Sequence, residues 1–393
     1  MPRIPSNGRY DSLDIWRGIA CLLVLLNHAL PYDATALPGP GAAERVYAAA
    51  SAVAARLWIG VPIFFVISGY CISAAADNHR RKNAPVSRYF IRRFRRILPP
   101  YWAVLGATAI AIGVGDIVLH GSLVKNSGFL RPWWFSWSQW FGSITLTELW
   151  RPYLFGSQKA LFLGHAWTLC YEEQFYAVSG VLLAVCPRRF FAGAAGVTVG
   201  VLALTMARPY LGHSIDGFFF DGNWILFALG ILLYWTLNYG EELQRLLAAG
   251  AFAVVIVWSL LHGRQLLDVA KNPAQEFLVA GVFALIALLH HPWDRQLVHA
   301  RLLSPIRVCG VMCYSLYLVH LPAINLLRAG LITAGLHDAT ARLLVTVPLS
   351  IVVSLWLGWA FHVHVERRFL NSQPKTARVE PRQNTALVSA AEA

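Results

Sequence analysis

The chain has 393 residues, of which 57% are hydrophobic and only 13% are charged. Because soluble proteins carry about 25% charged residues, this composition excludes an ordinary soluble domain and predicts an all-α polytopic membrane protein. The formal net charge of +13 does not indicate nucleic-acid binding, since the basic residues gather in loops on one predicted side of the membrane.

Ten segments are long and apolar enough to predict transmembrane helices. They lie near residues 13–31, 54–75, 98–115, 166–186, 190–206, 223–239, 246–262, 275–290, 308–328 and 342–363. With a cytoplasmic N-terminus and alternating spans, every strongly basic loop falls on the inner side, as the positive-inside rule requires. We therefore expect about ten transmembrane helices with both termini in the cytoplasm. Residues 1–370 form one transmembrane domain in this interpretation, and 371–393 form a polar, disordered cytoplasmic tail.

The first segment, LDIWRGIACLLVLLNHAL, carries Arg17 and His28. It has features of a signal peptide, but these two residues interrupt its apolar core, which favours a retained helix. Eleven residues apart, they share one helix face at an axial distance of about 16 Å. An ionisable residue inside the membrane is a functional-site hypothesis, and His28 lies about 22 Å from the inner boundary.

The second segment contains Ser68-Gly69, a pair that is typical of close helix packing. The basic stretch YFIRRFRRILPPYW then leads from the cytoplasm into the third segment, with Arg93 and Arg96 on one face. Guanidinium groups are preferred partners of phosphate. Such arginines also mark an inner loop or bind lipid headgroups, and the residues alone leave both interpretations open.

The fourth segment begins after an aromatic-rich outer loop at about 116–165 and contains HAWTLCYEEQFY. Its inward course places Glu172 about 21 Å from the inner boundary, at the depth of His28. A carboxylate beside an imidazole would orient it and raise its basicity. His165, at the mouth of this helix, would join them. The same pair would also serve as a polar tie between helices, and that alternative stays open.

The ninth segment contains the stretch CYSLYLVHLP, which places His320 near mid-membrane with Tyr314 and Tyr317 beside it. A single buried histidine is often a hydrogen-bonded strut, whereas two buried histidines and a glutamate in one bundle favour a functional site. The spacing of ligand residues does not predict a metal site.

These motifs together resemble the acyltransferase 3 family of bacterial inner-membrane acyltransferases, over residues of about 9–370. The family's motifs match Arg17 and His28; Phe64, Phe65, Val66, Ser68 and Gly69; Arg93 and Arg96; Trp167, Leu169, Glu172, Glu173, Gln174, Phe175 and Tyr176; and Tyr314 to Leu318 with His320. Thr168 and Cys313 stand where the family commonly has serine.

The resemblance implies transfer of an acyl group, most often acetyl, from acyl-CoA to a hydroxyl of a surface polysaccharide or lipid-linked saccharide. It implies catalytic His28, Glu172 and Arg17, with Arg93 and Arg96 binding acyl-CoA. Residues expected at the substrate are His165, Trp167, Ser68, Tyr314 and His320. We expect no resident cofactor or metal, and His28 acts either as general base or as covalent acyl carrier.

Two alternative functions share much of this pattern. A small hydroxylated metabolite such as a macrolide would use the same motifs with another acceptor pocket. A glycan transporter would also hold histidine, glutamate and arginine in its bundle, but it often shows inverted repeats, which are not seen in this sequence.

Overall fold

The computed structural model describes residues 10–31, 41–156, 158–207, 210, 217, 221–263 and 272–370, so the predicted tail lies outside the described part. Within these ranges every regular element is helical, which confirms the all-α prediction. The elements are α1 (Leu13–Ala29), α2 (Ala42–Ala54), η1 (Ala55–Ile59), α3 (Gly60–Arg81), α4 (Val86–Val118), α5 (Ser122–Ser127), η2 (Pro132–Trp134), α6 (Trp137–Thr145), α7 (Arg151–Phe155), η3 (Gly164–Ala166), α8 (Trp167–Val185), η4 (Pro187–Arg189), α9 (Phe190–Ala207), α10 (Asn223–Tyr239), α11 (Glu242–His262), α12 (Pro273–His290), η6 (His291–Trp293), α13 (Asp294–His299), η7 (Arg301–Leu303), α14 (Ser304–Val311), α15 (Cys313–Thr333), α16 (Ala339–Ala341), η8 (Arg342–Thr346), α17 (Val347–Phe361), η9 (His362–Glu366) and α18 (Arg367–Phe369).

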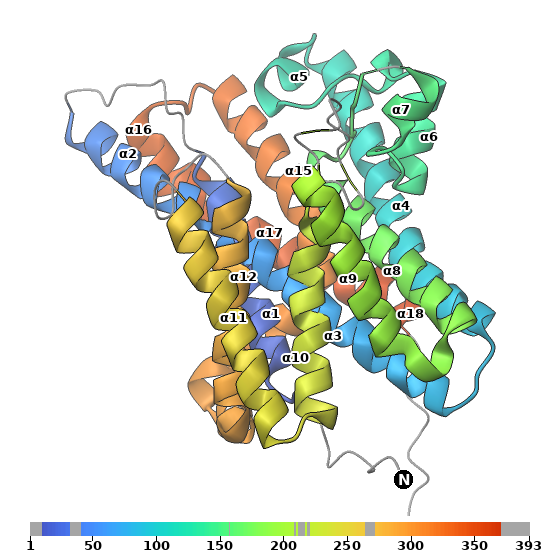
Figure 1. Ribbon diagram of the computed structural model, residues 1–393. Coiled ribbons are helices and arrows are strands. Elements are labelled where there is room, and N and C mark those ends of the chain that lie inside the picture. Colours follow the sequence, from blue (N-terminus) through green and yellow to red (C-terminus); the bar gives the residue numbers. More distant parts are fainter. Residues whose placement is uncertain are drawn as a thin grey trace, which may run out of the picture.

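Each of the ten predicted segments falls on helical residues, although some, such as 308–328, run across two helices. Seven helices in the described ranges are long and apolar enough to cross a membrane. The other three predicted segments are α1 and α10, with 17 residues each, and α8, which carries Glu172 and Glu173. Each of these three packs against several neighbouring helices (Figure 1). The membrane character is thus supported, and the count of ten spans stays a prediction.

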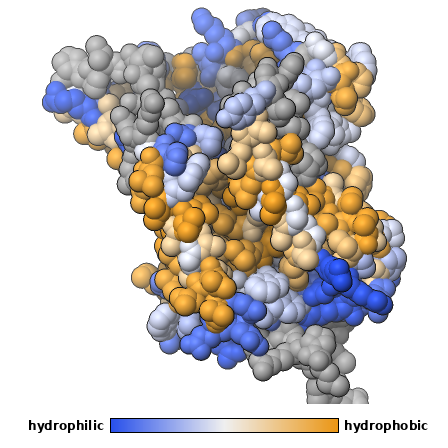
Figure 2. Space-filling view, viewed as in Figure 1, coloured by the Kyte–Doolittle hydropathy of each residue, from blue (hydrophilic) through white to orange (hydrophobic). Residues whose placement is uncertain are grey.

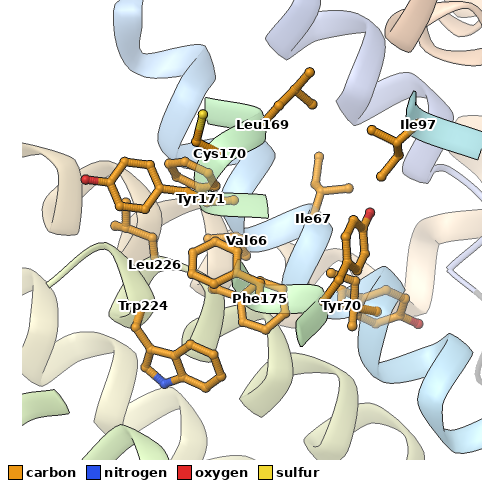
Figure 3. Packing of buried hydrophobic residues seen from close by; sticks show 14 of the residues in the cluster. Val66, Ile67, Tyr70, Ile97, Leu169, Cys170, Tyr171, Phe175, Trp224 and Leu226 are labelled. Atoms are coloured by element: carbon orange, nitrogen blue, oxygen red, sulfur yellow. The ribbon is translucent and has the colours of Figure 1, made fainter. Parts of the chain in front are cut away.

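Helices α3 and α10 cross at the centre of the bundle, where glycines let the backbones approach closely. A Cβ atom on Gly69 would lie 2.1 Å from the carbonyl oxygen of Phe227, and one on Gly230 would lie 2.0 Å from that of Val66. The predicted packing role of the second segment is confirmed. Phe175 of α8 joins this core, stacked on Phe227 with ring centroids 4.4 Å apart, and Figure 3 shows it beside Val66.

Helix α1 is held in a fixed position by α14, α3 and α15. It approaches α14 closely at Gly18, which has no side chain. A Cβ atom there would lie only 2.0 Å from the carbonyl oxygen of Ile306. A larger residue at this position would push the two helices apart. The neighbouring Arg17 is thereby placed at a defined height and rotation in the bundle.

Helix α4 is longer than the predicted third segment, since it covers Val86–Val118 and has 33 residues. The basic stretch before the apolar run is helical as well, and Pro99 and Pro100 lie inside the helix. Hydropathy marks only the part of a helix that suits a bilayer, so the sequence could not show this extension. Arg93 and Arg96 consequently project from a rigid helix.

The predicted outer loop at about 116–165 is a folded cap, which corrects the interpretation as a loop. It contains α5, η2, α6 and α7, and Figure 1 shows α5, α6 and α7 gathered at one end of the molecule. Inside the cap, Arg151 forms an ion pair with Glu148, at 2.7 Å between Nε and Oε2, and both side chains are fully buried. Breaking such a pair leaves an uncompensated buried charge, so we infer that it holds the cap together.

The surface agrees with a membrane location. Figure 2 shows hydrophobic residues across the middle of the visible face and hydrophilic residues gathered towards its ends. Large apolar side chains are exposed on the outer helices, including Ile110 and Val114 of α4, Val254 of α11, and Val352 and Trp356 of α17. An exposed apolar surface of this extent is expected where lipid covers the protein.

Candidate functional site

A cavity of about 140 Å³ lies where α1, α3, α4, α8 and α15 meet, and we call it the central cavity. Several residues singled out in the sequence line it: Arg17, Ser68, Arg93, Arg96, Glu172 and Tyr314. Most of its remaining walls are apolar side chains such as Phe64, Phe65 and Leu169. The fold therefore gathers polar groups from five separate helices around one largely apolar space, which is the usual character of a substrate site.

Arg93 and Arg96 line one end of the central cavity and also a second cavity of about 370 Å³. The second cavity lies between the end of α3 and the start of α4, and its other lysine and arginine residues are Lys82, Arg88 and Arg92. We call it the basic cleft. The guanidinium carbon of Arg93 lies 5.0 Å from the ring centre of Tyr176, which is a favourable cation–π distance. Arginine thus marks the junction of the two cavities.

Arg17 lies at the same end of the central cavity and has two side-chain partners. Its Nη1 donates to Oδ1 of Asp14 at 2.9 Å, and its Nη2 donates to Sγ of Cys71 at 2.8 Å. It also lines a third cavity of about 710 Å³ between α1, α3 and α10. We call Arg17, Arg93 and Arg96 the arginine end. Two openings on the same side of the bundle therefore lead towards these three cations.

Glu172 projects from α8 into the central cavity. Its Oε1 accepts hydrogen bonds from the hydroxyl of Tyr176 at 2.6 Å and from Oγ of Ser68 at 3.3 Å. The carboxylate is thus tied to its own helix and to α3, which restricts its rotation. Sequence reasoning paired Glu172 with His28, whereas the ring neighbour that the structure gives His28 is His320. The pairing of His28 with Glu172 stays a prediction.

Three histidines, His28, His165 and His320, lie together beyond Tyr317, and we call them the histidine cluster. The ring centroid of His320 is 5.3 Å from that of His28 and 5.3 Å from that of His165. Tyr317 lines the central cavity, and its ring centre lies 5.0 Å from that of His165. Its hydroxyl donates to the carbonyl oxygen of His165 at 2.7 Å and lies 2.9 Å from Oγ1 of Thr168. The cluster therefore adjoins the cavity across one tyrosine ring.

The two remaining predicted substrate residues occupy different surroundings. Tyr314 lines the central cavity and donates its hydroxyl hydrogen to the carbonyl oxygen of Ile97 at 2.7 Å. Trp167 packs edge-on against Phe65 and Tyr171, at centroid distances of 6.3 and 5.8 Å. It is outside the lining of the central cavity. Tyr314 is thus placed for contact with a ligand, and Trp167 supports the wall behind Phe65.

Sequence reasoning missed a polar cluster around Asp77 at the end of α3. This buried carboxylate pairs with Arg80 and Arg81, each at 2.6 Å, and accepts hydrogen bonds from Tyr234 and Tyr239 of α10. The spacing of three and four residues between Asp77 and the arginines was the available signal. Two of the basic residues that suggested an inner loop therefore fasten α3 to α10.

Comparison with known proteins gives the family. A profile described as an acyltransferase domain matches residues 10–363. The chain belongs to the acyltransferase 3 family. With the apolar helices described above, this membership identifies a multi-pass membrane protein of the acyltransferase 3 type. None of the solved structures compared matches the chain significantly.

Three curated proteins of known sequence are similar to this chain. The chain is 26% identical to a protein of Bacillus subtilis (strain 168) provisionally named peptidoglycan O-acetyltransferase YrhL, over 68% of this chain and 44% of that protein. It is 28% identical to a protein of Komagataeibacter xylinus provisionally named membrane-bound transacylase BcsY, over 98% of this chain and 89% of that protein. It is 24% identical to the O-acetyltransferase OatA of Staphylococcus aureus (strain NCTC 8325 / PS 47), over 68% of this chain and 46% of that protein. The chain thus spans less than half the length of YrhL and OatA.

Proposed function

We propose that this protein is a membrane O-acetyltransferase that moves an acetyl group from acetyl-CoA to a hydroxyl of a cell-surface polysaccharide or lipid-linked saccharide. The family and the printed names of the relatives support acyl transfer to a glycan. The observation that carries the proposal is the central cavity, which has a cationic end facing the basic cleft and a histidine cluster next to its other side.

Coenzyme A carries phosphates at one end and its thioester at the other, so it needs a cationic site joined to a reaction space. In our proposal the basic cleft holds the phosphates through Arg93 and Arg96, with bidentate hydrogen bonds that suit guanidinium groups. The pantetheine arm passes these residues into the central cavity, beside Arg17. Its apolar walls then bring the thioester close to Tyr314 and Tyr317.

The reaction takes place at the outer side of the central cavity. A neutral imidazole there takes the proton of the acceptor hydroxyl, or takes the acyl group itself and passes it on. His28, oriented by Glu172, is the candidate for either role. Rapid-quench mass spectrometry tests the covalent alternative, because acyl-His28 would be trapped during turnover. Ternary-complex kinetics without a trapped adduct would contradict it.

The proposed orientation places the basic cleft at the cytoplasmic face of the bacterial inner membrane. Ten spans with both termini in the cytoplasm put Lys82 and the α3–α4 junction inside, where acyl-CoA is made, and the cap of α5, α6 and α7 outside. The cap would then border the acceptor. Lipid headgroups would compete for the same arginines, so donor binding is expected to weaken in strongly anionic membranes.

Acyl-group analysis of purified surface polysaccharide tests the function directly. Cells express the wild type, His28→Ala or Glu172→Ala at matched membrane levels. Exposed His337→Ala and Glu242→Ala serve as controls of the same residue types. We expect acetate to be lost only in the two site variants, with the glycan otherwise intact. Unchanged acetate in all strains would contradict a polysaccharide acceptor and direct the search to secreted hydroxylated metabolites.

A further inference from the structure

The imidazole of His320 is held by the backbone of its own helix. Its Nδ1 lies 2.7 Å from the carbonyl oxygen of Tyr317 and 3.1 Å from that of Leu316. Carbonyl oxygens only accept hydrogen bonds, so Nδ1 must carry the hydrogen. In a neutral imidazole the other nitrogen, Nε2, then bears the lone pair. The α15 backbone therefore fixes the tautomer as well as the orientation of this ring.

The Nε2 atom of His320 is buried and has no hydrogen-bond partner among the described residues. The residue as a whole is 2% exposed. A buried polar atom without a partner costs free energy, and in a native protein such an atom calls for an explanation such as a catalytic role. Since Nδ1 faces its own helix, Nε2 lies on the far side of the ring. The rings of His28 and His165 lie beside that of His320, each with its centroid 5.3 Å away.

The acidic candidate of the site is less suited to act as a base. Glu172 already accepts two hydroxyl hydrogen bonds, from Tyr176 and Ser68, and these stabilise its charged form. It also lines the cavity together with the arginine end. A lone pair that is fixed in direction, buried and unoccupied is found instead at His320.

We propose that Nε2 of His320, in place of His28, is the base that takes the proton from the acceptor hydroxyl. This inference rests on the proposed function and deepens it. The hydroxyl oxygen bonds to the acyl carbonyl carbon while its proton moves to Nε2. The bond between that carbon and the acyl carrier breaks, and the electron pair stays on the carrier. The carrier is the thioester sulfur of the donor, or a nitrogen of His28 if His28 holds the acyl group. Loss of the proton from Nε2 to the departing carrier or to water restores the neutral ring.

The substitution His320→Asn separates this role from a structural one. The asparagine amide can still donate to the Leu316 and Tyr317 carbonyls, but it offers no lone pair at the position of Nε2. The test uses the full-length protein in detergent, radiolabelled acetyl-CoA, and surface polysaccharide from the producing cells stripped of acetate by mild base. We expect kcat to fall about 10²- to 10⁴-fold, with the KM for acetyl-CoA and the melting temperature unchanged. His337→Asn is the matched control.

Chemical rescue provides a second test. His320→Ala is assayed with 4-methylimidazole and with 4-chloroimidazole, which are similar in size but differ strongly in basicity. A base role predicts rescue by the methyl compound well above rescue by the chloro compound. Equal rescue by both would mean that the ring only fills space, and it would overturn the proposal. If neither compound restores activity, the kcat of His320→Asn decides whether His320 acts as the base.

The outcomes distinguish this inference from the function on which it rests. If the wild type transfers acetate and His320→Asn does so at the wild-type rate, the assignment of His320 is overturned and the proposed function stands. If the wild type labels no polysaccharide, the proposed function fails, and the assignment of His320 falls with it.

Discussion

The arginine end and the histidine cluster hold their polar groups in opposite ways. Arg17 keeps 23% of its side chain exposed and has a carboxylate partner, and Arg96 is exposed at the basic cleft. His165 and His320 are 7% and 2% exposed. The arginines thus keep part of their side chains near water, whereas two of the three rings of the histidine cluster are buried and His28 is half-buried. The contrast suggests that one end binds a charged donor and the other performs chemistry where water is excluded, so that electrostatic interactions are stronger.

The largest effect is expected at the histidine cluster. His28→Ala should lower kcat about 10²- to 10⁴-fold, because a positioned base or nucleophile contributes roughly that factor. The KM for acetyl-CoA should stay within about twofold if His28 makes no contact with the donor phosphates. Initial rates at varied acetyl-CoA concentration measure both constants. A raised KM with an unchanged kcat would place His28 in donor binding, and the functional difference between the arginine end and the histidine cluster would disappear.

At the arginine end we expect the reverse, a change in the KM for acetyl-CoA and little change in kcat. The double variant Arg93→Gln, Arg96→Gln should raise the KM for acetyl-CoA roughly 100-fold with kcat largely kept. Each charge-assisted hydrogen bond contributes about 1.5–3 kcal/mol, and 1.4 kcal/mol corresponds to a factor of ten. Equilibrium binding of acetyl-CoA to the purified protein checks this.

The charge-matched control for that double variant is Arg188→Gln, Arg189→Gln, which removes two exposed cations from η4. It should bind acetyl-CoA like the wild type. Equal weakening in both double variants would show that overall positive charge attracts the donor and that no local phosphate site exists at Arg93 and Arg96.

The smallest effect is expected between the two ends, at Ser68. Ser68→Ala removes the weaker hydrogen bond to Glu172, at 3.3 Å, and leaves the one from Tyr176, at 2.6 Å. A single hydrogen bond of this kind contributes about 0.5–1.5 kcal/mol, so kcat should fall roughly two- to tenfold. Tyr176→Phe should cost more than Ser68→Ala in the same assay. The reverse order would mean that the Ser68 hydroxyl contacts the substrate itself.

The sequence predicted the helices well because the length and hydropathy of an apolar run are local properties. It also selected Arg17, Ser68, Arg93, Arg96 and Glu172, which the fold brings to one cavity. Most of these residues are polar groups inside apolar helices, which are costly without a function.

The side-chain contacts that the structure shows could not be predicted in the same way. Axial depth placed His28 level with Glu172, but rotation of each helix about its axis depends on tertiary packing, such as the close approach of Gly18 to α14. That packing sets His28 beside His320 and ties Glu172 to Ser68 and Tyr176. The folded cap was missed because its buried ion pair and short helices have no hydropathy signature.

The central claim is that acetyl enters at the arginine end and leaves at the side of the histidine cluster. Sealed membrane vesicles of defined orientation test it, with radiolabelled acetyl-CoA on one face and de-O-acetylated surface polysaccharide on the other. We predict labelled polysaccharide only when acetyl-CoA is on the face of the basic cleft, with no label in His28→Ala vesicles. Transfer that is equal from either face, or that occurs only with acetyl-CoA on the face of the cap, would contradict the account.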